Sequence, residues 1–192
     1  MNPRIAIIIQ DSIRVHQALL QDEALVLTLE RVAQTCVETI QNGGKILFCG
    51  NGGSAADAQH LAAELSGRFY WDRDPLPAEA LHTNVSFLTA VGNDYGFEDV
   101  FARAVIATGK EGDVLFALST SGKSKNILHA METARQRGLK VVGMSGESGG
   151  KMAAHADYLL KVPSTDTPRI QECHLLLGHI ICELVEVGLF GQ

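Results

Sequence analysis

The sequence predicts an α/β fold, a three-layer sandwich in which helices cover both faces of a five-stranded parallel sheet, preceded by N-terminal helices. Strand-length apolar runs alternate with helical segments from residue 45 onward. These runs are continuously apolar, which is typical of parallel strands buried on both faces. The 192 residues, 46% of them hydrophobic, suffice for one well-packed domain and are few for two. We expect a single domain over 1–192, with a helical pair at 1–42 and an α/β core with a C-terminal helix at 43–192.

The chain from about 5 to 41 predicts two helices. Apolar side chains such as Leu25 and Leu29 recur at spacings of three and four, and Gly43-Gly44 supplies a stop. We expect a break near Gln21-Asp22 and a helical pair that caps the sheet.

Each later element has its own signal. The strands are short runs rich in Val, Leu, Ile, Phe and Ala, the helices follow turns of small polar residues, and Pro75 and Pro77 mark a loop. In order, we expect a strand at 45–49, a helix at 54–66, a strand at 78–81, helical stretches at 85–91 and 97–108, a strand at 114–118, a helix at 124–137, a strand at 140–144, a short helix at 150–154, a strand at 158–162 and a helix at 169–187.

Composition excludes several classes of partner. The formal net charge of −6 is spread without long single-sign runs, which argues against nucleic acid and against a basic membrane-binding face. The apolar stretches are short and interrupted, and no cleavage pattern follows the brief run at 5–9. We expect a cytoplasmic protein. The four cysteines lie far apart without a C-x-x-C pair, so we expect buried reduced thiols.

Two segments share one plan, in which an apolar strand leads through a turn of Gly, Ser, Thr or Asn into a helix. The first turn is Gly50 to Ser54 and the second is Ser119 to Ser124. Helix N-termini present unpaired N–H groups and the positive end of the helix dipole, which suits a phosphate. Ligands of open parallel sheets bind outside the carboxyl ends of the strands, where both turns fall. The pair of turns therefore indicates a small phosphorylated ligand.

Nucleotide ligands fit the two turns less well than a small phosphorylated ligand does. Residues 50–55 satisfy the letters of the dinucleotide fingerprint G-x-G-x-x-A, but the acidic residue expected about 20 residues later falls in the polar loop 70–75. The second turn lacks the spacing of a nucleotide P-loop. One of its serines can serve as an N-cap, but a single cap does not need four hydroxyls, and the surplus favours a phosphomonoester.

Polar residues on two helices are candidates for chemistry. His60 and Glu64 stand at i, i+4 on one helical face, a pattern that taken alone is equally that of a solvent-facing pair. The apolar last helix carries Gln171, His174 and His179, and polar groups on a buried helix need partners.

His60, Glu64, Gln171 and His179 together suit either a divalent-metal site or an acid/base pair with polar helpers. Gln171 and His179 are about 12 Å apart along a helix axis, so both reach one metal only if their side chains lean together. His174 is either a further partner of this set or a core histidine bonded to a carbonyl.

Four separate motifs resemble those of the phosphoheptose isomerase family, which has the sugar-isomerase (SIS) fold, a flavodoxin-like arrangement. They run nearly from end to end in the same order. The matching segments are 49–60 with 63–68, 92–97, 119–124 and 169–174.

The resemblance implies interconversion of sedoheptulose 7-phosphate and glycero-manno-heptose 7-phosphate, the first committed step toward the ADP-heptose of bacterial surface polysaccharide, by a homotetramer with active sites between subunits. We expect the amphipathic helix pair around Leu25 to Ile40 to pack between those subunits. It implies Glu64 and His179 as the acid/base pair, and zinc, one per active site, on His60, Glu64, Gln171 and His179. The implied substrate-binding residues are Ser54, Ser119, Thr120, Ser121 and Ser124 for the phosphate, and Asn51, Gly52, Gly53, Glu64, Arg68, Asn93, Asp94 and Gln171 for the remainder.

The chain departs from the family pattern at two places. It has His82-Thr83-Asn84 where Thr-Thr-Asp is common, and Pro168 where an acidic residue sometimes stands. Both departures concern recognition of the sugar hydroxyls, and the catalytic positions are intact.

Two questions stay open at this level. Glu64 can be the base and His179 the acid of an enediol mechanism, or a metal on both can polarise the sugar oxygens and leave the base unassigned. The rival function is a non-catalytic SIS-fold protein, either one that associates with a replication initiator or a sugar-phosphate sensor. Such proteins do not need the acid and the histidine that this chain has at positions 64 and 179.

Overall fold

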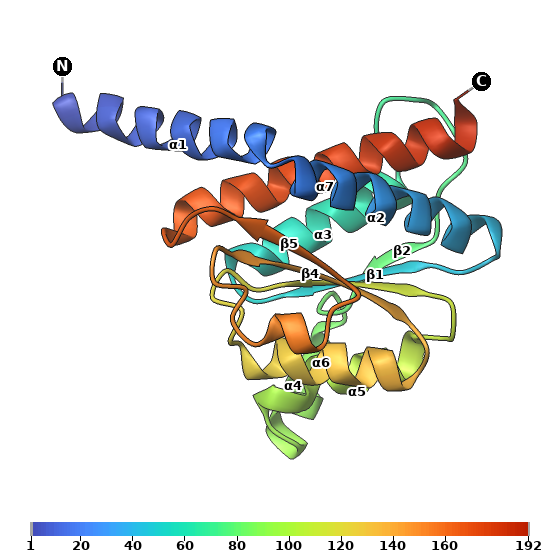
Figure 1. Cartoon of the computed structure of the whole chain (residues 1–192). Helices are drawn as coiled ribbons and strands as arrows, with labels where there is room; N and C mark the ends of the chain where they lie inside the picture. Colours follow the sequence, from blue (N-terminus) through green and yellow to red (C-terminus); the bar gives the residue numbers. More distant parts are fainter. Residues whose placement is uncertain (1, 192) are drawn as a thin grey trace.

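A computed structural model describes residues 2–191 and contains one five-stranded parallel sheet with strand order β2-β1-β3-β4-β5 (Figure 1). The predicted α/β class and parallel sheet are confirmed. The elements are α1 (Pro3–Gln21), α2 (Glu23–Gln41), β1 (Ile46–Gly50), α3 (Gly53–Ser66), β2 (Ala78–Ala80), α4 (Val85–Asp94), the 3₁₀ turn η1 (Phe97–Asp99), α5 (Val100–Thr108), β3 (Val114–Leu118), α6 (Lys125–Gln136), β4 (Lys140–Gly146), η2 (Met152–Ala154), β5 (Tyr158–Val162) and α7 (Thr167–Phe190).

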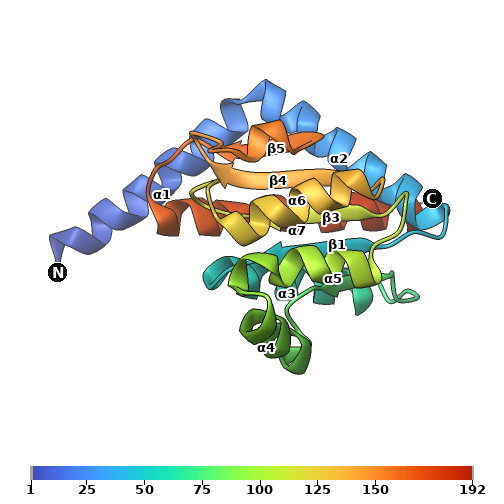
Figure 2. The same ribbon diagram turned by 90° about the horizontal axis from the view of Figure 1, so that it is seen from below.

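Two helical layers enclose the sheet. Alternate strand residues such as Phe48 and Phe116 face a core formed with α2, α3 and α7, whereas Leu47 and Leu115 face a core formed with α5 and α6. α4 lies on the outer side of this second layer in Figure 1, and Figure 2 shows it beyond α5, away from β3 and β4. Every residue of β1 and β3 is buried, which explains why their sequences are apolar without alternation.

The break between the first two helices falls where the sequence predicts it. α1 ends at Gln21, and the Asp22 carboxylate accepts the backbone N–H of Leu25 at 3.0 Å, which caps the start of α2. α2 lies against α7, but α1 projects past the body of the molecule and buries only Val15 and Leu19 (Figure 1). Most of the apolar surface of α1 is therefore uncovered.

The last helix is the central helix of the first core. α7 packs against both α2 and α3, and a Cβ at Gly178 would lie 2.5 Å from the side chain of Leu61 on α3. An 18-residue stretch of α7 has a mean hydropathy of 1.7, which by length and composition would allow a membrane span, although a buried core helix passes the same test. The close approach of α3 and α7 is what brings their polar side chains together.

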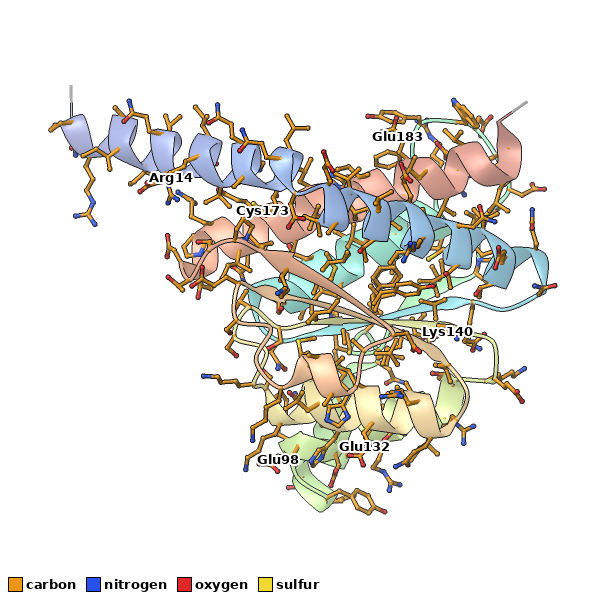
Figure 3. All side chains as sticks on the ribbon, in the orientation of Figure 1. Arg14, Glu98, Glu132, Lys140, Cys173 and Glu183 are labelled. Carbon is orange, nitrogen blue, oxygen red and sulfur yellow. The ribbon has the colours of Figure 1, made fainter. Side chains whose placement is uncertain are left out.

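All four cysteines are buried and free, as predicted. Burial raises the pKa of each thiol, to about 11 for Cys173 and to about 12 for Cys182. Cys173 lies beside α1, with its Sγ 3.9 Å from His16 Nε2 (Figure 3). The thiols are therefore protonated core groups at neutral pH.

Candidate active site

The two predicted phosphate turns lie side by side at the carboxyl ends of β1 and β3. These strands are paired neighbours in the sheet, and the side-chain amides of Asn51 and Asn126 form two reciprocal hydrogen bonds of 2.9 Å. Asn126 is in the first turn of α6, so this pair joins the first phosphate turn to the helix that follows the second. The amide of Asn51 keeps one N–H and one acceptor site for a ligand.

Two hydroxyl groups of the second turn, from Ser119 and Ser124, lie in contact with each other. Ser119 Oγ lies 3.1 Å from Ser124 Oγ, and Ser121 Oγ accepts the backbone N–H of Lys123 at 3.2 Å. Ser124 occupies the N-cap position of α6, but its side chain makes no capping bond, so the N-terminal N–H groups of α6 are not capped by it. A cavity of about 190 Å³ beside this turn is lined by Thr120, Ser121 and Lys123, among others.

The predicted residues of α3 and α7 meet in a three-membered group. His60 Nε2 lies 2.9 Å from His179 Nε2 and 3.3 Å from Glu64 Oε1. One ligand atom of each residue lies within 4.8 Å of the others. The spacing of His60 and Glu64 alone did not distinguish a surface pair from a site, whereas the approach of His179 from α7 does.

His179 is held in its neutral form by its surroundings. Burial lowers its pKa, the neighbouring His60 lowers it further, and Glu64 partly opposes both effects. The Phe69 ring covers one side, with ring centroids 5.7 Å apart. A neutral imidazole donates one N–H and accepts at the other nitrogen, so His179 can pass a proton without first carrying a charge.

The three side chains fit a divalent metal. Two imidazole nitrogens and one carboxylate oxygen are the ligand types that zinc takes, and three protein ligands leave a position for water or substrate, as catalytic zinc sites require. The lowered pKa of His179 favours the same neutral ring that a metal binds.

Gln171 lies at the other end of the α3–α7 contact. A Cβ at Gly53 would be 2.5 Å from Gln171 Nε2, so only glycine there lets the amide approach the first turn of α3. His60 is seven residues further along α3, about 10 Å along the axis. The structure thus places Gln171 beside the phosphate turn.

His174 is a buried core histidine. Its side chain is 0% exposed, and burial lowers its pKa to about 4, a drop that the backbone of Ser145 only partly offsets. Of the two predicted roles, the structure therefore favours the core side chain.

The lowered pKa of His174 predicts a dependence of stability on pH. Below the unfolded pKa of about 6.5 the unfolded chain binds a proton that the folded chain does not, so stability should fall as the pH falls from about 6.5 to 4. The loss should be up to about 3 kcal/mol. Urea unfolding of wild type and His174→Leu across this range tests it. An equal slope in both proteins would contradict the assignment.

Two predicted substrate residues lie in a different helical layer from the three-membered group, and a third is exposed in a loop. Asn93 and Asp94 are exposed at the end of α4, in the opposite helical layer, and are hydrogen-bonded to each other at 2.9 Å. Arg68 is exposed in the loop after α3. Within residues 2–191, neither Asn93 nor Asp94 contacts His60, Glu64 or His179 by a hydrogen bond.

The structure adds a buried ion pair that the sequence analysis did not identify. Arg73 and Glu186 meet beside the three-membered group, with both side chains 2% exposed. Arg73 stands in a polar loop and Glu186 in an apolar helix, 113 residues later. The one available signal was a charged residue in the apolar stretch of the last helix, which must find a partner when buried.

Comparisons with known proteins agree with this architecture and site. The family model described as "SIS domain" matches residues 10–146. The chain is 54% identical to a phosphoheptose isomerase of Aneurinibacillus thermoaerophilus over 99% of this chain and 96% of that protein. It is 55% identical to one of Burkholderia pseudomallei over 96% and 93%. The structure of a phosphoheptose isomerase from Neisseria gonorrhoeae has a TM-score of 0.89 and 46% identity over 95% of this chain and 97% of that chain.

The family model and the site define the class of this protein. It is a sugar-isomerase domain whose helices α3 and α7 present an acid and two histidines. The chain belongs to the SIS domain family and, within it, to the phosphoheptose isomerases. The family predicted from the four motifs is confirmed, and with it an enzyme in preference to a non-catalytic binding protein.

Proposed function

We propose that this protein interconverts sedoheptulose 7-phosphate and glycero-manno-heptose 7-phosphate in heptose biosynthesis. The observation that carries the proposal is the convergence of Glu64, His60 and His179, a group that begins two helical turns after the first phosphate turn, with the hydroxyl-rich second turn on the neighbouring strand. The distance of about 10 Å along α3 is comparable to the length of an extended seven-carbon sugar phosphate. A sugar bound with its phosphate at the turn can therefore present C1 and C2 near His60, whose Nε2 lies 3.3 Å from Glu64 Oε1.

The reaction moves one proton between adjacent carbons. In the conversion of ketose to aldose, Glu64 removes a proton from C1. The electron pair forms the C1–C2 double bond, and the carbonyl oxygen on C2 takes a proton from His179. The enediol then returns its O1 proton to His179 and receives the proton held by Glu64 at C2, which gives the aldose and restores both side chains. The 2.9 Å contact between His179 and His60 supplies a route by which the histidine can be reprotonated.

The phosphate and the sugar use different parts of the chain. The hydroxyls of Ser119, Ser121 and Ser124, with N–H groups of α6, hold the phosphate, and Thr120 and Ser54 border the same site. Gln171 and Asn51 lie at the phosphate end of α3 and contact the sugar chain. His82 and Pro168 depart from the family pattern; they would alter recognition of the sugar hydroxyls, and Pro168 also stands in the first turn of α7.

We further propose that the three-membered group binds one zinc ion per active site. When bound, the metal would polarise the sugar carbonyl and hydroxyl oxygens. His60, Glu64 and His179 are the ligands that the geometry supports, and Gln171 joins them only if its side chain leaves Gly53.

Metal analysis of gently purified protein should find about one zinc per chain. Loss of an outer-shell partner typically lowers metal affinity 10- to 100-fold, so His60→Ala and His179→Ala, which lose a ligand, should lower it more. A zinc titration of the metal-free protein measures this directly. Equal affinity in wild type and both variants would refute the metal site.

The exposed apolar surface supports a homotetramer with active sites between subunits. The sequence placed the subunit contact on the helices around 25–40, but that face of α2 is occupied by α7 within the chain. A dense group of uncovered apolar residues lies on α1, where Ile5, Ile7 and Ile9 are each more than half exposed. A neighbouring chain could also bring its Asn93 and Asp94 to the site.

Light scattering should give four times the chain mass, and a monomer at micromolar concentration would contradict the proposal. The cytoplasmic location stays a prediction.

The function is tested by incubating the purified protein with sedoheptulose 7-phosphate and following the products by NMR, with and without added zinc. Signals of the aldose phosphate should grow to a constant ratio with the ketose. The proposal fails if the substrate binds and stays unchanged under both conditions.

A further inference from the structure

The Arg73–Glu186 ion pair is the most completely buried charged contact near the active site. Arg73 Nε donates to Glu186 Oε1 at 2.8 Å, and both side chains are 2% exposed. Removing two charges from water is costly, so a buried ion pair is weak evidence for a role in stability alone. The contacts of each partner indicate what else the pair does.

The Glu186 carboxylate holds the loop that follows α3. It accepts the backbone N–H groups of Phe69, Tyr70 and Trp71 at 3.2, 2.8 and 3.1 Å. Burial raises the pKa of Glu186, but these bonds and the one from Arg73 outweigh burial and lower it overall, so the carboxylate is ionised. Glu186 lies two turns after His179 on α7, and the loop it anchors places the Phe69 ring against the His179 ring.

The Arg73 guanidinium holds the end of α3. Its Nη2 donates to the backbone carbonyl of Glu64 at 3.0 Å, and its Nη1 donates to that of Leu65 at 2.9 Å. Carbonyls in the last turn of a helix have no partner within the helix, so Arg73 acts as a C-terminal cap. The capped turn carries the Glu64 side chain.

We propose that Arg73 and Glu186 are positioning residues that fix Glu64 and His179 relative to each other. One partner binds the backbone of Glu64 on α3, and the other sits on α7 and packs Phe69 onto His179. The planar guanidinium can bond Glu186 and the α3 carbonyls at the same time, which a lysine ammonium cannot do with the same geometry. This role rests on the proposed isomerase reaction, and neither residue touches the substrate.

The test compares Glu186→Gln and Arg73→Lys with a matched control, Asp113→Asn. Asp113 is also 2% exposed, pairs with Lys45 at 2.8 Å and accepts the N–H groups of Lys45 and Lys110, but it lies at the amino ends of the strands. A displacement of about 1 Å can cost about 100-fold in rate, so kcat should fall about 10- to 100-fold in the two site variants with little change in KM. In the control, kcat should stay within about twofold of wild type even if Tm falls.

A second measurement does not depend on activity. The imidazole signals of His179, followed by NMR in ¹⁵N-histidine-labelled protein, should shift in Glu186→Gln and Arg73→Lys and should stay unchanged in Asp113→Asn. If the wild type proves to have no isomerase activity, the proposed function fails while this spectrum still reports on positioning. Should Glu186→Gln not fold, Arg73→Lys carries the test, because it keeps the charge. Unchanged His179 signals in the site variants, or equal loss of kcat in the control, would overturn the proposal.

Discussion

Glu64→Gln should lower kcat about 100- to 10,000-fold, because the amide keeps the size of the side chain but cannot accept a proton from the substrate. The affinity for the sugar phosphate should change little, since the phosphate turn that begins α3 lies about three helical turns from Glu64. His179→Gln should lower kcat similarly. The double variant should lose less than the product of the two single losses, because both residues serve one proton transfer. Steady-state kinetics at saturating substrate measures all three.

Glu132→Gln is the matched control, an exposed glutamate on α6 in the helical layer opposite α3 and α7 (Figure 3). It should retain the wild-type kcat. Metal content must be measured with each rate, because Glu64 is also a candidate metal ligand. A Glu64→Gln protein with normal metal content and normal kcat would rule out Glu64 as the base.

Replacing Ser121 and Ser124 together by alanine should raise KM about 100- to 10,000-fold. Hydrogen bonds to a charged group contribute about 1.5–3 kcal/mol each, and each factor of ten in affinity corresponds to about 1.4 kcal/mol. Ser121 is exposed and Ser124 half-buried, so the substitutions leave the packing of the core intact. Isotherms for the sugar phosphate and for inorganic phosphate measure the change.

Ser86→Ala, an exposed serine on α4, serves as the control for this pair. Its affinity for both ligands should equal that of wild type. If the double variant also keeps full affinity for inorganic phosphate, the phosphate lies elsewhere, and the assignment of the second turn is wrong.

Most of the fold follows from patterns of apolar residues that act over short distances. The three central strands β1, β3 and β4 were predictable because each is buried along its whole length or nearly so, whereas the edge strands β2 and β5 are only partly buried and were predicted from short apolar runs. The ends of the strands were less predictable. The strand predicted to end at 144 continues to Gly146, because Ser145 and Gly146 still pair with β5 although their sequence is typical of a turn. α7 begins at Thr167 because Pro168 suits the first turn of a helix. The sequence interpretation considered Pro168 only for sugar recognition and therefore started this helix at Arg169.

The residues of the candidate site could be predicted from the sequence, but the contacts between them could not. The i, i+4 spacing predicts that His60 and Glu64 share a face, but only the packing of α3 on α7 brings His179 to 2.9 Å from His60. The same packing separates Gln171 from the group and places it at Gly53. Arg73 and Glu186 stayed unrecognised because a pair so distant in sequence leaves no local pattern.

The central claim is that Glu64 and His179 move a proton between C1 and C2 of a heptose phosphate. The direct measurement is ¹H and ¹³C NMR of sedoheptulose 7-phosphate incubated with the zinc-loaded wild-type protein in D₂O. We predict that deuterium enters C1 of the ketose and C2 of the aldose, and that Glu64→Gln slows this exchange in proportion to its loss of kcat. Wild-type protein that binds the sugar phosphate but incorporates no deuterium at either carbon would contradict the account.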